Sequence, residues 1–193
     1  MRLATMVLLG TLALGTSVAA QEKPAQVHKG LWGGFGLGAG VNVSEGDRWG
    51  VDVYGRIGGT LSQRVLLGGE SSGWAGSNQG VDMARGNVSA IILYYPSLRG
   101  GLFLRGGLGF SYIQTSISDG TTVNGVFYQT TVSQTSGGVG ATASIGYDVR
   151  LGRNIFLVPE FGWALQSVGS ESTFFGVPST VNILSFTLGL VWH

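Results

Sequence analysis

Apolar and polar residues alternate with a period of two along most of this sequence, and the alternation limits the chain to β-structure. The pattern is clearest over residues 138–150. There the apolar positions are Val139, Ala141, Ala143, Ile145, Tyr147 and Val149. Successive side chains of a strand point to opposite faces, so this pattern predicts strands with one apolar and one polar face. Beyond residue 20 no stretch offers about eighteen uncharged apolar residues, which excludes a membrane protein built of helices.

The alternation recurs in eight segments, which we expect to be the strands of a single domain. They cover residues 31–43, 49–57, 65–74, 87–95, 102–112, 138–150, 155–163 and 184–192. Short connections at 61–64, 95–100 and 151–154 alternate with long polar ones at 75–86, 114–136 and 166–180, and only 44–47 is a brief connection on the long side. In outer-membrane barrels short turns face the periplasm and longer loops face the exterior. The sequence therefore predicts an all-β fold, an eight-stranded antiparallel up-and-down transmembrane β-barrel.

The first twenty residues have the pattern of a secretory signal peptide. Arg2 precedes an apolar stretch over residues 3–14, and small residues follow at 16–20. We expect cleavage after Ala20, a flexible periplasmic lead-in over residues 21–29 and a barrel domain over residues 30–193. The alternative is an uncleaved N-terminal membrane helix, but the apolar stretch is shorter than the roughly 20 residues that such a span requires.

Charge is sparse in this chain. Charged residues make up 11% of the sequence, the formal net charge is +1, and cysteine is absent. This balance provides no basic field for nucleic acid, and the lack of cysteine excludes disulfides, thiolate metal sites and a lipidated N-terminal cysteine. A soluble eight-stranded ligand-binding barrel would need many charges on its outer face. The sequence therefore favours a barrel whose apolar face meets lipid.

Seven charged residues fall on the polar face of the expected strands. They are Asp52, Arg56, Glu70, Arg105, Asp148, Arg150 and Glu160. A charge on the lipid face would be costly, and side chains can just fill an eight-stranded barrel, so we expect a lumenal charge network. A three-residue turn at 62–64 would set Arg56 directly opposite Glu70, which predicts an ion pair between them. Such a network can be a polar plug or the lining of an ion path.

Aromatic residues occur on the apolar face near the ends of the expected strands. Trp49, Tyr112 and Trp163 lie near loop ends, and Trp192 lies near a turn-side end. Two aromatic bands of this kind form the girdles of a membrane barrel at its two interfaces. We therefore expect these four residues to form the aromatic girdle.

The last strand carries the most specific likeness to a known family. Residues 184–193 read Leu-Ser-Phe-Thr-Leu-Gly-Leu-Val-Trp-His, and 147–152 and 159–163 match a strand-turn-strand region. In these segments the chain resembles the small bacterial outer-membrane barrels typified by OmpX and the transmembrane domain of OmpA. Members usually end on an aromatic residue, whereas His193 follows Trp192 here.

The resemblance implies insertion in the bacterial outer membrane, with lipid and lipopolysaccharide as surroundings and no cofactor. It also implies a C-terminal signal for the barrel-assembly machinery, which would include Leu188, Leu190 and Trp192. We expect the barrel to be a monomer.

The chain lacks an evident catalytic constellation. His28 and His193 are the two histidines, both lie outside or at the edge of the strands, and we expect them to be too far apart for a metal site. Serine without an activating base is a weak nucleophile. We therefore expect no enzymatic activity, although some eight-stranded relatives act on lipid A.

The long connections suggest a role at the cell surface. The segment 114–136 contains Phe127 and Tyr128, and the segment 166–180 contains Phe174 and Phe175. Such aromatic loops can be adhesive or can extend the barrel wall as hairpins. We expect a structural or surface-interaction barrel with a closed lumen. The alternatives are a narrow channel, a soluble ligand binder or a lipid A-modifying enzyme.

Overall fold

The computed structural model describes residues 27–44, 48–78, 81–123, 126–168 and 180–193. These residues form nine β-strands that follow one another along the chain. The strands are β1 (Leu31–Asn42), β2 (Arg48–Ser62), β3 (Val65–Asn78), β4 (Val81–Tyr94), β5 (Leu102–Val123), β6 (Val126–Tyr147), β7 (Val149–Arg150), β8 (Ile155–Val168) and β9 (Thr180–Trp192). No helix among the described residues is long and apolar enough to cross a membrane. The expected leader over residues 1–20 and most of the lead-in lie outside the described residues.

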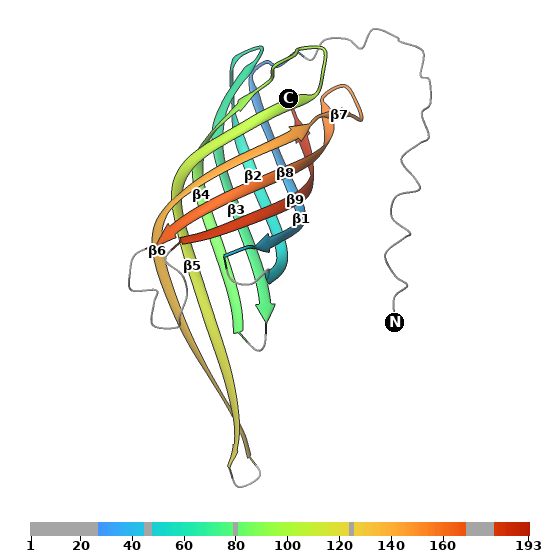
Figure 1. Cartoon of the computed structure of the whole chain (residues 1–193). Coiled ribbons are helices and arrows are strands. Elements are labelled where there is room, and N and C mark those ends of the chain that lie inside the picture. Colours follow the sequence, from blue (N-terminus) through green and yellow to red (C-terminus); the bar gives the residue numbers. More distant parts are fainter. Residues whose placement is uncertain (1–26, 45–47, 79–80, 124–125, 169–179) are drawn as a thin grey trace, which may run out of the picture.

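The strands close into one barrel (Figure 1). Each strand from β1 to β5 pairs antiparallel with the next, β6 pairs with β8, β8 with β9, and β9 returns to pair with β1. The two-residue β7 continues β6 beyond Asp148 and pairs with β8, so it belongs to the same wall. The barrel therefore has eight strands, and the predicted fold is confirmed.

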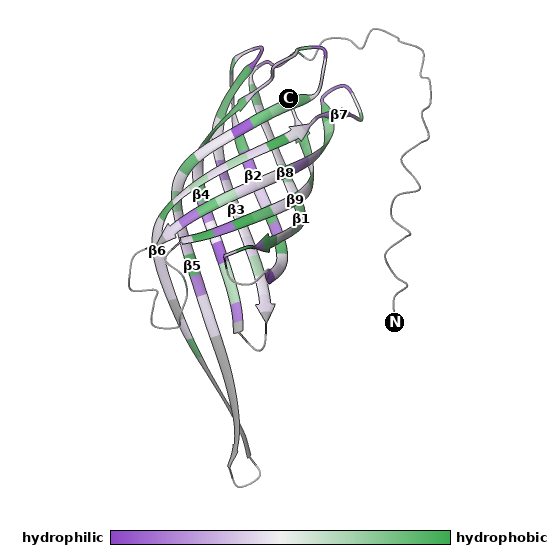
Figure 2. Cartoon of the chain, in the orientation of Figure 1, coloured by the Kyte–Doolittle hydropathy of each residue, from purple (hydrophilic) through white to green (hydrophobic). Residues whose placement is uncertain are grey.

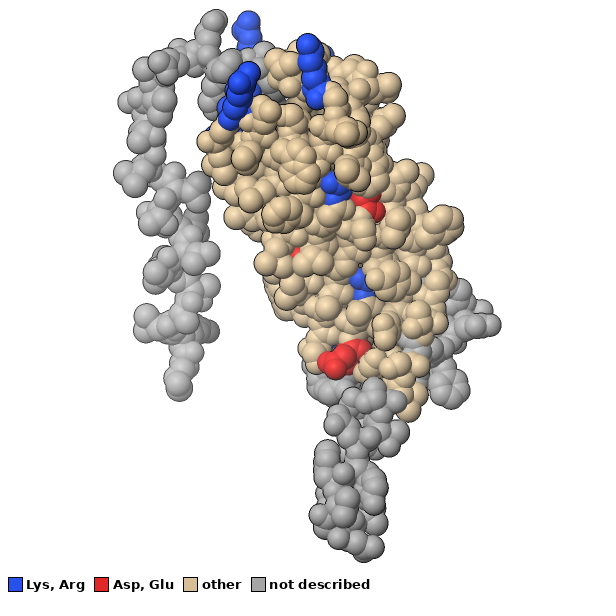
Figure 3. All heavy atoms as spheres, turned by 180° about the vertical axis from the view of Figure 1, so that it is seen from behind, with Lys and Arg blue, Asp and Glu red and all other residues tan. Residues whose placement is uncertain are grey.

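The barrel has two unlike ends. The turn end holds the connections at residues 63–64, 95–101 and 151–154, together with His28 and His193. The loop end holds the opposite ends of the strands, at Asn42 and Arg48, Asn78 and Val81, Val123 and Val126, and Val168 and Thr180. Figure 3 shows Lys and Arg side chains gathered at the turn end, with an almost uncharged surface over the strands between the two ends.

The outward side chains of the strands form an apolar belt. Phe35, Leu108 and Phe110 are 57%, 72% and 78% exposed, and other large apolar residues alternate along the same faces. Figure 2 shows these apolar positions recurring along the wall strands. A closed barrel leaves no unpaired strand edge, so a belt of this kind can meet hydrocarbon without exposing backbone polar groups.

Glycine allows neighbouring strands to approach closely within this wall. A Cβ at Gly38 would collide with the carbonyl oxygen of Phe186, and a Cβ at Gly109 would collide with that of Val88. Side chains at these positions would push the strands apart. The close approach explains why glycine is so frequent on the inner face of a narrow barrel.

One predicted loop is strand wherever the structure describes it, since residues 75–78 end β3 and residues 81–86 begin β4. For residues 114–136 the hairpin alternative is confirmed, because they extend β5 and β6 to the pair Val123 and Val126. The sequence shows no apolar face in these segments because they lie beyond the belt, where both faces of a strand can be polar. Thr, which is frequent in residues 114–136, favours strands. In the third long connection β8 ends at Val168 and β9 begins at Thr180. Phe174 and Phe175 lie outside the described residues.

Candidate functional site

The lumen is filled by three layers of side chains. At the turn end lies an apolar cluster made of Trp32, Leu66, Ile91, Leu93, Tyr95, Phe103, Phe156, Val158 and Val191. At the loop end lies a second cluster made of Trp74, Met83, Ile113, Val181 and Ile183. Between them lies an ion-pair layer made of Arg56, Glu70, Arg105 and Glu160.

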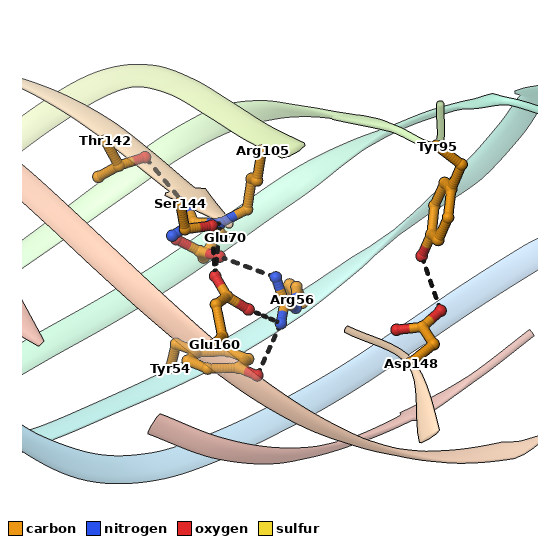
Figure 4. A network of polar contacts seen from close by, with 9 residues as sticks. All are labelled: Tyr54, Arg56, Glu70, Tyr95, Arg105, Thr142, Ser144, Asp148 and Glu160. Atoms are coloured by element: carbon orange, nitrogen blue, oxygen red, sulfur yellow. Dashed lines mark hydrogen bonds and ion pairs between the residues drawn. The ribbon is translucent and has the colours of Figure 1, made fainter. Parts of the chain in front are cut away.

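The ion-pair layer is a closed ring in which each carboxylate meets two guanidinium groups (Figure 4). Arg56 lies 2.6 Å from Glu160 and 3.8 Å from Glu70. Arg105 lies 2.6 Å from Glu70 and 3.0 Å from Glu160. All four side chains are nearly inaccessible to solvent, and their two positive and two negative charges cancel. Buried charges are tolerated only when paired in this way.

Neighbouring hydroxyl groups add further hydrogen bonds to the ring, although Nε and Nη1 of Arg56 and Oε2 of Glu70 have no hydrogen-bond partner among the described residues. Arg56 donates to the hydroxyl of Tyr54 at 2.6 Å, and its guanidinium stacks 4.2 Å from the centre of that ring. Ser144 donates to Glu160 at 2.6 Å and accepts from Arg105 at 2.9 Å. Arg105 also donates to Thr142 at 3.1 Å. These contacts fix the four ionic side chains in one arrangement.

The predicted register is confirmed, with one addition. Arg56 on β2 is directly opposite Glu70 on β3, as the predicted three-residue turn at 62–64 requires. The shorter ion pair of Arg56, however, reaches Glu160, which lies on β8 and is not a neighbour of β2 in the sheet. The ring thus crosses the lumen and ties together β2, β3, β5 and β8.

Little space remains in the lumen beside the ring. A cavity of about 40 Å³ borders Asp52, Glu70, Trp74 and Arg85 on the loop side of the ring. A water molecule needs roughly 10–15 Å³ of such space, so the cavity holds a few waters and no continuous file. At the level of the ring, the described side chains therefore leave room for little more than these waters.

Solved structures provide a comparison for this geometry. Neisserial surface protein A matches with a TM-score of 0.55 and 15% identity, over 84% of this chain and 95% of that one. Ail, the attachment invasion locus protein of Yersinia pestis, matches with a TM-score of 0.54 and 11% identity, over 85% and 98%. The N-terminal β-barrel domain of Pseudomonas aeruginosa OprF matches with a TM-score of 0.50 and 14% identity, over 86% and 99%.

This chain has the fold of the small bacterial outer-membrane β-barrels. At these identities the likeness concerns the fold. No protein-family model matches the sequence, and comparison with curated proteins gives no match. The apolar belt requires a lipid bilayer, and the outer membrane is the bilayer in which barrels of this fold reside.

The aromatic residues expected at the interfaces of this outer-membrane barrel all point outward. Trp49 is 68% exposed and lies at the loop end of β2, and Trp192 is the last residue of β9 at the turn end. Tyr112 and Trp163 are also exposed, and the indole of Trp163 donates to Asn182 at 3.3 Å. Leu188 and Leu190 share the outward face of β9 with Trp192.

Three of the seven charges expected in the network lie outside the ring. Asp52 is half-buried and borders the lumen cavity. Asp148 is buried at the turn end, where it accepts a hydrogen bond from the hydroxyl of Tyr95 at 3.0 Å. The prediction for Arg150 was wrong, because its side chain is exposed and its guanidinium lies 5.4 Å from the ring centre of Phe156. Arg150 is the last residue of the two-residue β7, so its long side chain reaches solvent at the rim of the barrel.

The expectation that the two histidines lie far apart was also wrong. The rings of His28 and His193 are 4.7 Å apart, and both side chains are buried at the turn end. Tyr95, Asp148 and His193 each lie two positions after the last lumenal residue of a strand, and His28 lies four positions before Trp32, the first lumenal residue of β1. Alternation placed Asp148 on the polar face, but the two histidines lie outside the expected strands, so their inward direction was not predicted.

Arg85 was missed for a different reason. It is 2% exposed on the lumenal face of β4 and contacts the sulfur of Met83 at 2.8 Å. Its segment was assigned to a loop, so its inward direction was not considered.

Proposed function

We propose that this protein is a closed outer-membrane barrel that serves as a surface-interaction protein, with the β5–β6 hairpin as its contact element. The observation that carries the proposal is that this hairpin projects beyond the loop end of the other strands, at the bottom of Figure 1. The lumen supports a surface role because the ring and the two apolar clusters fill it.

The hairpin extends beyond its neighbours on both sides. The last pair of β4 with β5 is Val81 with Ile117, and six further pairs of β5 with β6 follow, up to Val123 with Val126. On its other side β6 pairs with β8 only from Gly138 onward. Six residues of strand span about 20 Å. Within the described residues, this part of the hairpin has no strand beside it.

The composition of the hairpin indicates the chemistry of its partner. Residues 114–136 are rich in Ser, Thr and Gln, and Asp119 is their single charge. The segment also contains Phe127 and Tyr128. Such a surface suits a partner that offers hydrogen bonds and flat apolar groups more than one that offers charge. Ail carries attachment and invasion in its name, which is consistent with a surface role for this fold.

A shortened hairpin tests the proposal. Ile117 and Val132 are paired, so residues 118–131 can be replaced by Asn-Gly to form a two-residue turn without a change of register. Cells that display this variant should lose attachment to an epithelial monolayer or to one another, while the barrel still folds. Asp119→Asn, which removes only the charge, serves as the matched control and should attach normally. Attachment that survives shortening of the hairpin overturns the proposal.

The closed lumen leads to a second expectation. In a planar bilayer the folded barrel should give no ion conductance, because Arg56, Glu70, Arg105 and Glu160 occupy its middle. Steady single-channel currents would instead favour the narrow-channel alternative.

The positions of the histidines support a non-enzymatic role. His28 contacts Gln63 and Tyr95, and His193 contacts Asp148 and Phe156, all within the turn end. Neither imidazole is placed to activate a hydroxyl at the lipid belt. Lipid A of unchanged mass after co-expression is the expected result.

The outward residues of β9 suggest how the barrel is assembled. We infer that Leu188, Leu190 and Trp192 present the C-terminal signal to the barrel-assembly machinery, and that lipid and lipopolysaccharide surround a monomeric barrel. The three side chains share one exposed face, as a recognition strip requires.

A further inference from the structure

Three potential metal ligands meet at the turn end of the lumen. His28 precedes β1, Asp148 joins β6 to β7, and His193 follows β9. One ligand atom from each lies within 4.8 Å of the other two, and Nε2 of His193 is 3.5 Å from Oδ2 of Asp148. The side chains of Asp148 and His193 are 1% and 2% exposed, and His28 is fully buried. We call these residues the turn-end triad.

The hydrogen bonds of His28 fix which ring nitrogen is free. Nδ1 lies 2.7 Å from the backbone carbonyl oxygen of Gln63, and a carbonyl can only accept, so Nδ1 carries the proton. Nε2 is therefore the nitrogen with a lone pair. It is buried and has no hydrogen-bond partner among the described residues. Histidines that bind metals have this arrangement, with the second nitrogen donating to a carbonyl or carboxylate.

The side chain of Gln63 holds His28 in place. It accepts from the backbone nitrogen of His28 at 3.1 Å and donates to the backbone oxygen of His28 at 3.0 Å. The lead-in is thus anchored to the β2–β3 turn, and the free nitrogen of His28 is held in a defined direction.

Asp148 has a similar division of roles between its two oxygens. Tyr95 donates to Oδ2, whereas Oδ1 is buried without a hydrogen-bond partner among the described residues. Both ring nitrogens of His193 also have no hydrogen-bond partner there. Unsatisfied buried polar atoms are rare and costly in folded proteins. One ligand atom from each of the three residues lies within 4.8 Å of the other two, so a single cation between them would give these residues the partner that they lack.

Burial also keeps His28 in the form that binds metals. Desolvation is the largest influence on its imidazole and lowers its pKa below the ordinary value of 6.5, against the opposing hydrogen bond to Gln63. A neutral imidazole is the ligand that divalent transition metals require.

We propose that His28, Asp148 and His193 bind a divalent transition-metal ion of the Zn²⁺ class. Imidazole and carboxylate ligands suit this class, and three protein ligands leave one position for water. The ion would supply the positive charge that Asp148 lacks. It would also fasten the lead-in, the β6–β7 junction and the end of β9 to one another.

The geometry needs only a small adjustment to hold the ion. Zn²⁺ lies about 2.0–2.2 Å from such ligands, so two ligands of a tetrahedral site are about 3.4 Å apart. The Asp148 and His193 atoms already have this spacing at 3.5 Å. The remaining separations, up to 4.8 Å, require a closure of at most roughly 1.4 Å. His28 precedes the first residue of β1 and His193 follows the last residue of β9, so small movements of these two residues can provide it.

Metal titration of the folded barrel tests the proposal. The full chain without a polyhistidine tag is folded in detergent and titrated with Zn²⁺, and with Co²⁺ as a spectroscopic probe. We expect one ion per chain and visible Co²⁺ absorption of a four-coordinate nitrogen and oxygen site. Asp148→Asn and His28→Gln should each weaken binding at least about 100-fold. Tyr95→Phe, which removes only the hydroxyl that orients Asp148, should weaken it about 10–100-fold.

Asp82→Asn is the matched control, because Asp82 is an exposed carboxylate at the loop end. It should bind Zn²⁺ like the unaltered chain. A folded barrel that binds no Zn²⁺ at micromolar concentration overturns the proposal, as does binding that Asp148→Asn and Tyr95→Phe leave unchanged. If His28→Gln fails to fold, Tyr95→Phe still decides the question. The triad lies at the end opposite the hairpin, so this test and the attachment test can fail separately.

Discussion

The ion-pair layer and the turn-end triad are both buried polar groups in one lumen, but their charges are balanced differently. In the layer two guanidinium groups face two carboxylates, so the permanent charges cancel. In the triad one carboxylate faces two imidazoles, which carry no permanent positive charge. Both groups contain buried atoms that have no hydrogen-bond partner among the described residues. The layer is therefore electrically balanced without a ligand, whereas the charge of Asp148 is balanced only when a proton or a metal ion is added.

The largest effect should come from breaking the ion-pair layer. Glu160→Gln removes the carboxylate that bonds both Arg56 and Arg105, and leaves two buried guanidinium groups with Glu70 alone. Removal of one member of a buried ion pair costs about 3–5 kcal/mol, because the other charge stays buried. We expect the free energy of unfolding in urea to fall by this amount, as followed by tryptophan fluorescence.

Asp148→Asn in metal-free protein provides the comparison. This carboxylate meets no guanidinium among the described residues, and an amide oxygen can still accept the hydrogen bond from Tyr95. The substitution should therefore change the free energy of unfolding by less than about 1 kcal/mol. Equal losses for Glu160→Gln and Asp148→Asn would show that the charges of the layer and of the triad are balanced in the same way, and would contradict the difference proposed here.

The same contrast shows what the sequence could and could not reveal. Alternation placed Arg56, Glu70, Arg105 and Glu160 in the lumen, and the length of the turn at 62–64 paired Arg56 with Glu70. The sequence could not pair Arg56 with Glu160, because 104 residues separate them and the contact depends on how the barrel closes. That closure is set by the stagger of all eight strands together.

The inward direction of the turn-end residues follows from the alternation, but the apolar residues that reveal the alternation stop before them. His28 lies an even number of positions from lumenal Trp32, His193 from Val191 and Tyr95 from Leu93. Each lies just past the region in which the opposite face is apolar. For residues 114–136 the sequence left a loop and a hairpin both open for a related reason, since strands outside lipid need no apolar face.

Acidification should lower the free energy of unfolding through His28 of the triad, by less than the loss expected for Glu160→Gln. Burial lowers the pKa of His28 in the folded protein, so below pH 6.5 the unfolded chain binds more protons than the folded chain. Stability therefore falls as the pH drops through this range, by at most about 1.4 kcal/mol per pH unit for one proton. We expect metal-free protein to unfold at lower urea concentration at pH 5.5 than at pH 6.5.

His28→Gln separates this effect from the titration of other groups. His193, Asp148, the Gln63 carbonyl and the Tyr95 ring face His28, and all remain in the variant. The variant should show a flatter dependence of the unfolding midpoint on pH. Identical slopes for the two proteins would assign the pH dependence to groups other than His28.

The smallest effect should come from Arg150, which tests where the charged lumen ends. The alternation predicted that Arg105 and Arg150 belong to one network, whereas the structure buries only Arg105. Arg150→Gln loses a stacking contact with Phe156 at the rim, so it should cost less than about 1 kcal/mol. Arg105→Gln, the same change inside the ring, should cost about 3–5 kcal/mol. Similar losses in urea unfolding would mean that Arg150 has a buried ionic partner. Unequal losses would limit the ionic part of the lumen to the ring, because only there does a lost charge leave another one buried and unpaired.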